Sequence, residues 1–515
     1  MTSSLSSSPR KLLPNDVKSK FYLLISLAAV IWFAALARGA HDLWAVSVLC
    51  AFLSLLASIF LYFRAKSHSP ITLPLVCPFG ALFLGVIISA RFAFDVNTAH
   101  LEIVGLACAI ACFFLFSNLF QEQSMRRLVM PYAGSVMFPL AAIALLQHFR
   151  NAPPLKEELR LLGTVGYSHW SAAATFTNSS LYAGLSLSWI LPAWHHRQAG
   201  RYYQWLFGCC LLSLFLSRSW WALICLTVGF MLYYKKSSKN IRNQRVSIIF
   251  FMTSISLFIL ALIIKFGPGR DPSYLADSRL GWWTAGIRMF IEHPWVGVGL
   301  GGYATAFPYF KPSVSQNTLF AHSFPVQVLA ETGLAGLLGF LAVGVTCWRR
   351  AYDQTSVTPE NQAYRATLTI LLMFSLTTIF LDTWIGKLML LMSLSLVLAS
   401  SSLERFSISK RHTWLTVGIL LLLIPSWYLP FRSSQFDAIG LTYETTREPV
   451  KAEAAFQKAL ALNPNEDDSC RGLARLYERR YQQTHSMLDF SNSLLWSREA
   501  LRLKQVRLSY SEKTK

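Results

Sequence analysis

Runs of about 20 apolar residues recur along most of the chain and constrain its fold more than any other feature. A helix needs about 20 apolar residues to cross the hydrocarbon core of a bilayer. Candidate spans lie at 20–38, 43–63, 71–90, 101–120, 130–147, 171–193, 203–217, 219–234, 247–266, 324–347, 366–382, 385–402 and 412–430. The sequence therefore predicts an all-α polytopic membrane protein with 12–13 transmembrane helices.

The overall composition excludes a soluble protein. Of 515 residues, 53% are hydrophobic and 14% are charged, which is too apolar for a soluble domain. Eight of the nine cysteines lie in apolar runs, where they pack as small hydrophobic residues, and Cys470 has no soluble partner. No disulfide framework is expected. The first apolar run continues to about Arg38 without a small-residue cleavage site, so no cleavable signal peptide is expected.

The formal charge of +21 reflects membrane topology and not nucleic-acid binding, because the basic residues fall in short loops between spans instead of one patch. Most of these residues lie on one side if each span crosses once. The positive-inside rule then makes residues 1–19 a cytoplasmic tail and 20–430 the membrane domain. The loop 267–323 and the C-terminal region 431–515 then lie outside.

Arg218 separates two short apolar runs, 203–217 and 219–234, which form either a hairpin or one long helix with a charge in its middle. One long helix would put the basic segments 194–202 and 235–246 on opposite faces and break the charge pattern. We therefore predict a hairpin, with Arg218 at an outward-facing turn.

The C-terminal region contains a candidate repeat. Residues 454–464 resemble the second helix and terminal proline of a tetratricopeptide repeat, and residues 498–503 echo residues 457–462 at a spacing of 41. A standard unit has about 34 residues, so either an insertion around 482–487 lengthens this unit or the second unit is degenerate. Such units normally stack in threes or more. We expect this α-helical domain to need the membrane domain or a protein partner for stability.

The stretch 277–341 contains the longest polar interruption between the spans. Asp277 or Ser278 can cap a helix that runs to Pro294, with a broad apolar face suited to a bilayer surface. A glycine-rich turn follows at 297–302. Its spacing also satisfies the dinucleotide-binding pattern, but no βαβ unit surrounds it, so we reject that interpretation.

Three ionisable residues are the strongest candidates for chemistry. Arg218 lies at membrane depth, where a charge is costly and usually functional, although it could merely snorkel to the interface. Arg279 lies in the first turn of the loop helix, where the helix dipole disfavours a cation unless an anion binds; alternatively it is a solvated surface arginine. His322 lies where the loop enters the membrane, or it is an ordinary loop histidine. Arg288 and His293 are weaker candidates, and His293 before Pro294 first suggests a helix end.

These three residues suit transfer of a group activated by phosphate. Two arginine forks match the oxygens of a diphosphate and keep their charge when desolvated. A neutral histidine can accept the proton of an attacking hydroxyl. The chain lacks a convincing HExxH motif, Cys/His cluster or Walker loop, so we expect neither a metal nor a cofactor.

Several short motifs resemble the O-antigen ligase and O-antigen polymerase family. They are Arg279 with Trp283, His293-Pro294-Trp295, Gly297-Val298-Gly299, Ala321-His322-Ser323, Glu331 to Gly336, the upstream Ser217-Arg218-Ser219, and the span motif of residues 175–184 with Asn178. Ser323 and Ser180 stand where the family often has asparagine.

The resemblance implies a membrane glycosyltransferase of the GT-C type that transfers glycan, with inversion, from undecaprenyl diphosphate to lipid A-core, another glycan or protein. Arg218 and Arg279 would hold the diphosphate, and His322 would position or deprotonate the acceptor hydroxyl. Arg288, Asn178 and Ser323 would support the site. Several relatives carry C-terminal tetratricopeptide-like repeats, which suits a partner-binding role.

Two other classes of function remain possible from the sequence. One is a flippase or transporter of lipid-linked glycans, and the other is a catalytically silent scaffold that gathers an envelope assembly through its repeats. The enzyme is favoured because the unusual charges cluster at the outer face instead of lining a path through the bilayer.

Overall fold

The computed structural model describes residues 15–37, 39–40, 43–66, 71–94, 96–150, 178–237, 252, 279–312, 318–352, 358–399, 405–406, 410–464 and 466–505. Helices dominate this part of the chain. The strands found in it, β1 (Ile71–Thr72) and β2 (Arg405–Phe406), form a single antiparallel pair. The prediction of an all-α membrane protein is confirmed. Of the predicted span 247–266, only Met252 is described.

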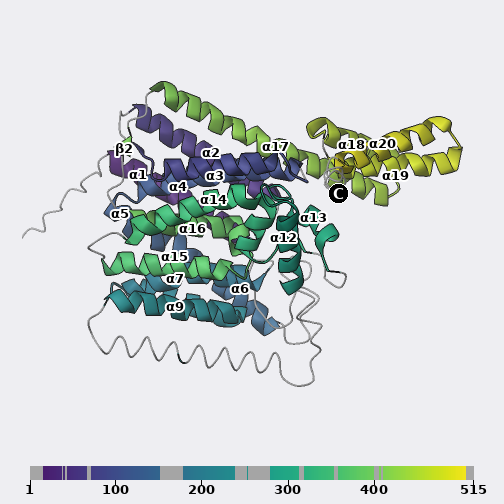
Figure 1. Cartoon of the computed structure of the whole chain (residues 1–515). Helices are drawn as coiled ribbons and strands as arrows, with labels where there is room; N and C mark the ends of the chain where they lie inside the picture. The colour runs from purple at the N-terminus through teal and green to yellow at the C-terminus, as the bar shows by residue number, and fades with distance from the viewer. Residues whose placement is uncertain are drawn as a thin grey trace, which may run out of the picture.

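Helices occupy the positions of the other twelve predicted spans and lie side by side in one bundle (Figure 1). They are α1 (Asn15–Leu36), α2 (Leu43–Lys66), α3 (Val76–Ala90), α4 (Val96–Leu119), α5 (Gln123–Ala133), η1 (Gly134–Val136), α6 (Met137–Arg150), α7 (Ser179–His196), α8 (Arg201–Ser217), α9 (Trp220–Ser237), α14 (Phe324–Tyr352), α15 (Pro359–Ser375), α16 (Trp384–Leu398) and α17 (Lys410–Thr445).

Five helices within the described residues are long and apolar enough to cross a membrane. They are Leu43–Lys66, Thr98–Leu119, Gln123–His148, Phe324–Arg350 and Arg411–Thr445. The chain is therefore a multi-pass membrane protein, whereas the total of 12–13 crossings stays a prediction.

Helix α15 differs from its predicted span, 366–382, because it begins seven residues earlier, at Pro359. The side chain of Thr358 accepts a hydrogen bond from the Asn361 N–H at 3.2 Å and caps the helix, and proline is well suited to the first helical position. The helix ends at Ser375, and a short 3-10 turn, η4 (Phe380–Asp382), precedes α16. The polar start of α15 is buried by neighbouring helices, which hydropathy alone does not reveal.

Contacts between distant segments define two ends of the bundle. At one end Lys20 pairs with Glu122 at 2.7 Å, and β1 pairs with β2; we call this the basic end, because the predicted basic loops join helices there. At the opposite end the Phe94 N–H donates to the Val298 carbonyl at 2.9 Å. We call this the site end. From α1 to α9, and again from α14 to α17, the described helices run alternately between these two ends.

Helices α8 and α9 form the predicted hairpin. The end of α7 contacts both the start of α8, through His196 and Tyr203 with ring centroids 5.4 Å apart, and the end of α9, through His195 and Tyr233 at 2.9 Å. The chain therefore leaves the basic end in α8 and returns to it in α9. Arg218 lies at the turn with φ 51°, in the left-handed region that few side chains adopt.

Helix α17 continues past the predicted membrane boundary at residue 430 without a break and becomes the first helix of the C-terminal region. Helix α18 (Pro449–Leu462) packs against its last turns, α19 (Asp467–Thr484) packs on α18 and α17, and α20 (Met487–Gln505) packs on α19. These helices extend beyond the bundle (Figure 1). The buried Phe456 packs closely against Gly440 and Gly472. These helices form two antiparallel pairs, and their assignment as tetratricopeptide repeats stays a prediction.

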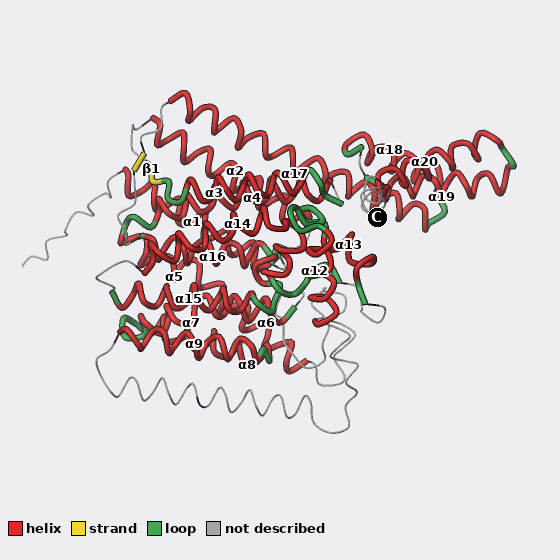
Figure 2. The backbone as a smooth tube through the Cα atoms, in the orientation of Figure 1, coloured by secondary structure: helices red, strands yellow, loops and turns green. Residues whose placement is uncertain are grey.

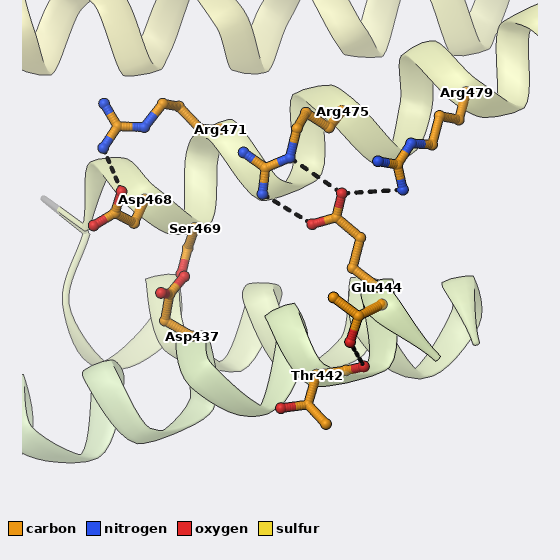
Figure 3. A network of polar contacts seen from close by, with 9 residues as sticks. Asp437, Thr442, Glu444, Asp468, Ser469, Arg471, Arg475 and Arg479 are labelled. Carbon is orange, nitrogen blue, oxygen red and sulfur yellow. Dashed lines mark hydrogen bonds and ion pairs between the residues drawn. The ribbon is translucent and has the colours of Figure 1, made fainter. Parts of the chain in front are cut away.

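A polar network fastens α19 to α17 (Figure 3). Arg475 donates two hydrogen bonds to the Glu444 carboxylate, at 3.1 and 2.8 Å, and Arg479 lies 3.2 Å from the same group. The Ser469 hydroxyl donates to Asp437 at 2.7 Å. Because the Glu444 side chain is only 5% exposed, these bonds are screened less by water than ordinary surface pairs. The network fixes the second helix pair relative to the helix that leaves the membrane.

Candidate active site

Two short helices, α12 (Gly281–Glu292) and α13 (Tyr303–Phe310), cover the site end of the bundle and are joined by irregular turns (Figure 2). Helix α12 buries Ala285, Gly286 and Met289 and packs on α14. Gly286 permits this close approach, since a Cβ there would lie 2.6 Å from Val326. The expected caps Asp277 and Ser278 lie outside the described residues. The helix ends at Glu292 with His293 at its C-cap, close to the predicted end at Pro294.

The glycine-rich turn docks on a kink in α14. Gly333 interrupts this helix with φ 56° and ψ −154°. The interruption leaves helix N–H and carbonyl groups without their partners within α14, and the turn forms hydrogen bonds with them. The Val298 N–H donates to the Ala330 carbonyl at 2.9 Å, and the Leu334 N–H donates to the Pro294 carbonyl at 2.8 Å. The turn lies between two helices and not after a strand, which supports the rejection of dinucleotide binding.

Replacing Gly333 with alanine should destabilise the protein and lower its activity. A Cβ at this position would lie 2.6 Å from the backbone of Trp295 and Val296, and strained positive-φ conformations cost about 1–3 kcal/mol each. Thermal unfolding in detergent would measure the loss. Gly344→Ala is the matched control in the same helix, because a Cβ there meets nothing within 4 Å. Equal unfolding temperatures for the two variants would contradict this account of the kink.

His322 is held in an unusual position directly before α14. Its φ is 53°, and its ring stacks on that of Trp282 with centroids 4.4 Å apart and planes 27° apart. Burial lowers the pKa of His322 to about 4, and the positive charge of Arg279 contributes to the same shift. The imidazole is therefore neutral at pH 7, as a proton acceptor must be.

Arg279 lies close to His322, since its charge acts on the histidine. It stands three residues before Trp282, on whose ring His322 stacks. Its side chain is exposed at the site end. The structure therefore brings together two of the three residues that the sequence singled out.

Arg218 lies at the same end of the bundle, at the turn between α8 and α9. Its N–H donates to the Phe215 carbonyl at 3.2 Å and closes the last turn of α8, while its side chain is exposed. The position at an interhelical turn agrees with the sequence analysis. Its predicted contact with a donor diphosphate stays a prediction.

The three supporting residues have local structural contacts. Arg288 donates to the Phe310 carbonyl at 3.3 Å and so fastens the end of α13. The Asn178 side chain accepts from the Ser180 N–H at 2.8 Å and caps α7. Ser323 is 4% exposed, and its carbonyl accepts from the Gln327 N–H at 2.9 Å as α14 begins. Their predicted role in supporting the site stays a prediction.

Buried and half-buried polar residues that the sequence analysis did not select also lie at the site end. The Gln327 side chain donates to Glu331 at 2.7 Å, and both residues are almost fully buried. Lys387 lies 3.5 Å from Glu102, and Asp382 lies near both. A possible signal was the spacing of four between Gln327 and Glu331, which puts both on one face of an apolar helix.

Comparison with known proteins assigns this region to a family. Residues 205–341 match the sequence model described as O-antigen ligase, and the match includes Arg218, Arg279 and His322. No curated protein matches the chain. The chain is therefore a multi-pass membrane protein that carries an O-antigen ligase domain over residues 205–341.

Proposed function

We propose that the protein is a glycosyltransferase that moves glycan from a polyprenyl-diphosphate-linked donor to a hydroxyl acceptor at the periplasmic face of a bacterial inner membrane. The observation that carries this proposal is that Arg279 lies near enough to His322 for its charge to lower the histidine pKa, inside the matched domain. A neutral base near a cation is what attack on a diphosphate-activated sugar needs.

In the proposed reaction the acceptor oxygen attacks the anomeric carbon as the bond from that carbon to the diphosphate oxygen breaks. The proton of the hydroxyl passes to a ring nitrogen of His322. The departing lipid diphosphate keeps the bonding electrons, and Arg218 and Arg279 stabilise its charge by bidentate hydrogen bonds. Displacement from the opposite face inverts the sugar carbon.

The position of Arg279 also couples donor binding to proton transfer. In the free site its charge helps to lower the pKa of His322. A bound diphosphate would offset that charge, so the pKa of His322 would rise toward the working pH, where a general base is most effective. The histidine would thus become a better base only when a donor is present.

Transfer can be tested directly with purified protein in proteoliposomes. Lipid-linked glycan is supplied with lipid A-core, free glycan or protein as acceptor, and the product is analysed for glycan linkage and anomeric configuration. The proposal expects transfer to at least one acceptor class. Accelerated movement of the lipid across the bilayer without transfer to any acceptor would instead support the transporter.

Membrane orientation makes a separate prediction. In a variant lacking the nine native cysteines, Gln198→Cys at the basic end should react only with reagents that enter the cytoplasm. Gln457→Cys in α18 should react with impermeant reagents from the periplasm, because α17 crosses the membrane between the two ends. Thr284→Cys in α12 is the control for the site end. The orientation is wrong if Gln198→Cys and Thr284→Cys react from the same side.

A further inference from the structure

The segment before His322 is anchored by a side chain from the following helix. The Ala321 N–H donates to the Gln327 side-chain oxygen at 2.7 Å. The amide nitrogen of Gln327 then donates to the Glu331 carboxylate at 2.7 Å. Gln327 and Glu331 are only 6% and 8% exposed, so water competes little for these bonds.

The same carboxylate also anchors the partner ring of His322. The oxygen of Glu331 that accepts from Gln327 accepts from the Tyr303 N–H at 3.2 Å. The Tyr303 hydroxyl donates to the Trp282 carbonyl at 2.7 Å. Glu331 therefore connects both sides of the stack between Trp282 and His322.

We propose that Gln327 and Glu331 are positioning residues that hold His322 against Trp282 in the geometry required for catalysis. This inference rests on the proposed function of His322. A histidine at φ 53° keeps such a conformation only where the surroundings enforce it, and the bond to the adjacent Ala321 supplies that constraint. Neither residue contacts the reacting atoms, since both are buried beneath the loop.

The directions of the hydrogen bonds determine which substitutions preserve the network. Gln327 must accept at its oxygen and donate at its nitrogen, whereas Glu331 only accepts. Glu331→Gln can still accept both bonds. Gln327→Glu cannot donate and faces a second carboxylate. Combining it with Glu331→Gln restores a donor between the two positions, now directed from 331 to 327, but the amide nitrogen takes the place of the shared oxygen, so the Tyr303 N–H loses its acceptor.

The kinetic test compares the two single variants with the exchanged pair. We expect kcat to stay close to that of the wild type in Glu331→Gln and to fall about 10²-fold in Gln327→Glu, since small misplacements of a catalytic group have effects of this size. The double variant should recover part of the lost rate, because the anchor at Ala321 is restored while the bond to the Tyr303 N–H is not. Donor affinity should be unchanged in all three. A double variant no faster than Gln327→Glu would overturn the proposal.

A second measurement does not depend on transfer activity. The amide of Ala321 should exchange slowly with deuterium in the wild type and in Glu331→Gln, and faster in Gln327→Met, which removes its acceptor. Gln362→Met is the matched control, because Gln362 is also buried but donates to the Leu232 carbonyl at the basic end. Unchanged exchange at Ala321 in Gln327→Met would refute the network. An inactive wild type with the expected exchange pattern would refute only the proposed function.

Discussion

Replacing His322 with alanine is expected to lower kcat by about 10²–10⁴-fold, the usual contribution of a general base. Donor binding should persist, because the diphosphate is held by arginines and not by the imidazole. Rates at saturating donor, together with direct binding of a labelled lipid-linked glycan, would separate the two effects. Near-normal transfer by His322→Ala would remove the histidine from the mechanism even though the family assignment would stand.

His100→Ala provides the control for this prediction. His100 is an exposed histidine near the start of α4, at the same end of the bundle. Its replacement should leave both kcat and donor binding unchanged. A comparable loss in the two variants would mean that any substitution at this end disturbs the protein, and the effect at His322 would carry no information about proton transfer.

The pH dependence of donor capture follows from the lowered pKa of His322. The free-enzyme pKa of about 4 lies below the ordinary value of about 6.5 for histidine. The neutral form therefore dominates above pH 5, so kcat/KM should show no loss attributable to this group between about pH 5 and 7. The same lowered pKa affects stability. The contribution of His322 to the free energy of unfolding is full above the pKa of histidine in the unfolded chain. It decreases as the pH falls toward 4, because the unfolded chain binds the proton more tightly.

The helices were predictable because an apolar run long enough to cross a membrane predicts a helix without any knowledge of tertiary contacts. The hairpin at Arg218 was harder, and there the charges of the flanking loops decided between two hydropathy patterns that were otherwise equivalent. The contacts of His195 and His196 with α9 and α8 confirm that choice. The early start of α15 was missed, because burial of its polar first turns depends on tertiary packing.

The site was predictable in part. Motifs identified Arg279 and His322, but their proximity depends on how α12 docks against α14. The kink at Gly333 was not visible, since a glycine in an apolar run is compatible with an uninterrupted helix and its positive φ arises from the docked turn. Lys387 and Glu102 were missed for a related reason, because single charges at the ends of two spans become a pair only in the folded bundle.

Lysine at position 279 or 218 is expected to weaken donor binding about tenfold to a hundredfold, because hydrogen bonds to charged groups contribute about 1.5–3 kcal/mol and lysine loses the bidentate fork. Titration with a lipid diphosphate would measure the change. Arg201→Lys is the control, since Arg201 is an exposed arginine at the opposite end of the helix that precedes Arg218. Unchanged affinity in both Arg279→Lys and Arg218→Lys would refute the proposed diphosphate site.

The two arginines should differ in their effect on the acid limb of the kcat/KM profile. Arg279→Ala removes the cation that helps to lower the pKa of His322, so the limb should move to higher pH. Arg279→Lys keeps the charge and should leave the limb nearly in place while donor affinity falls. Substitutions of Arg218 should weaken binding without moving the limb. If the acid limb does not move in Arg279→Ala, the charge of Arg279 does not affect the pKa of His322. That result would exclude the proposed coupling between donor binding and proton transfer.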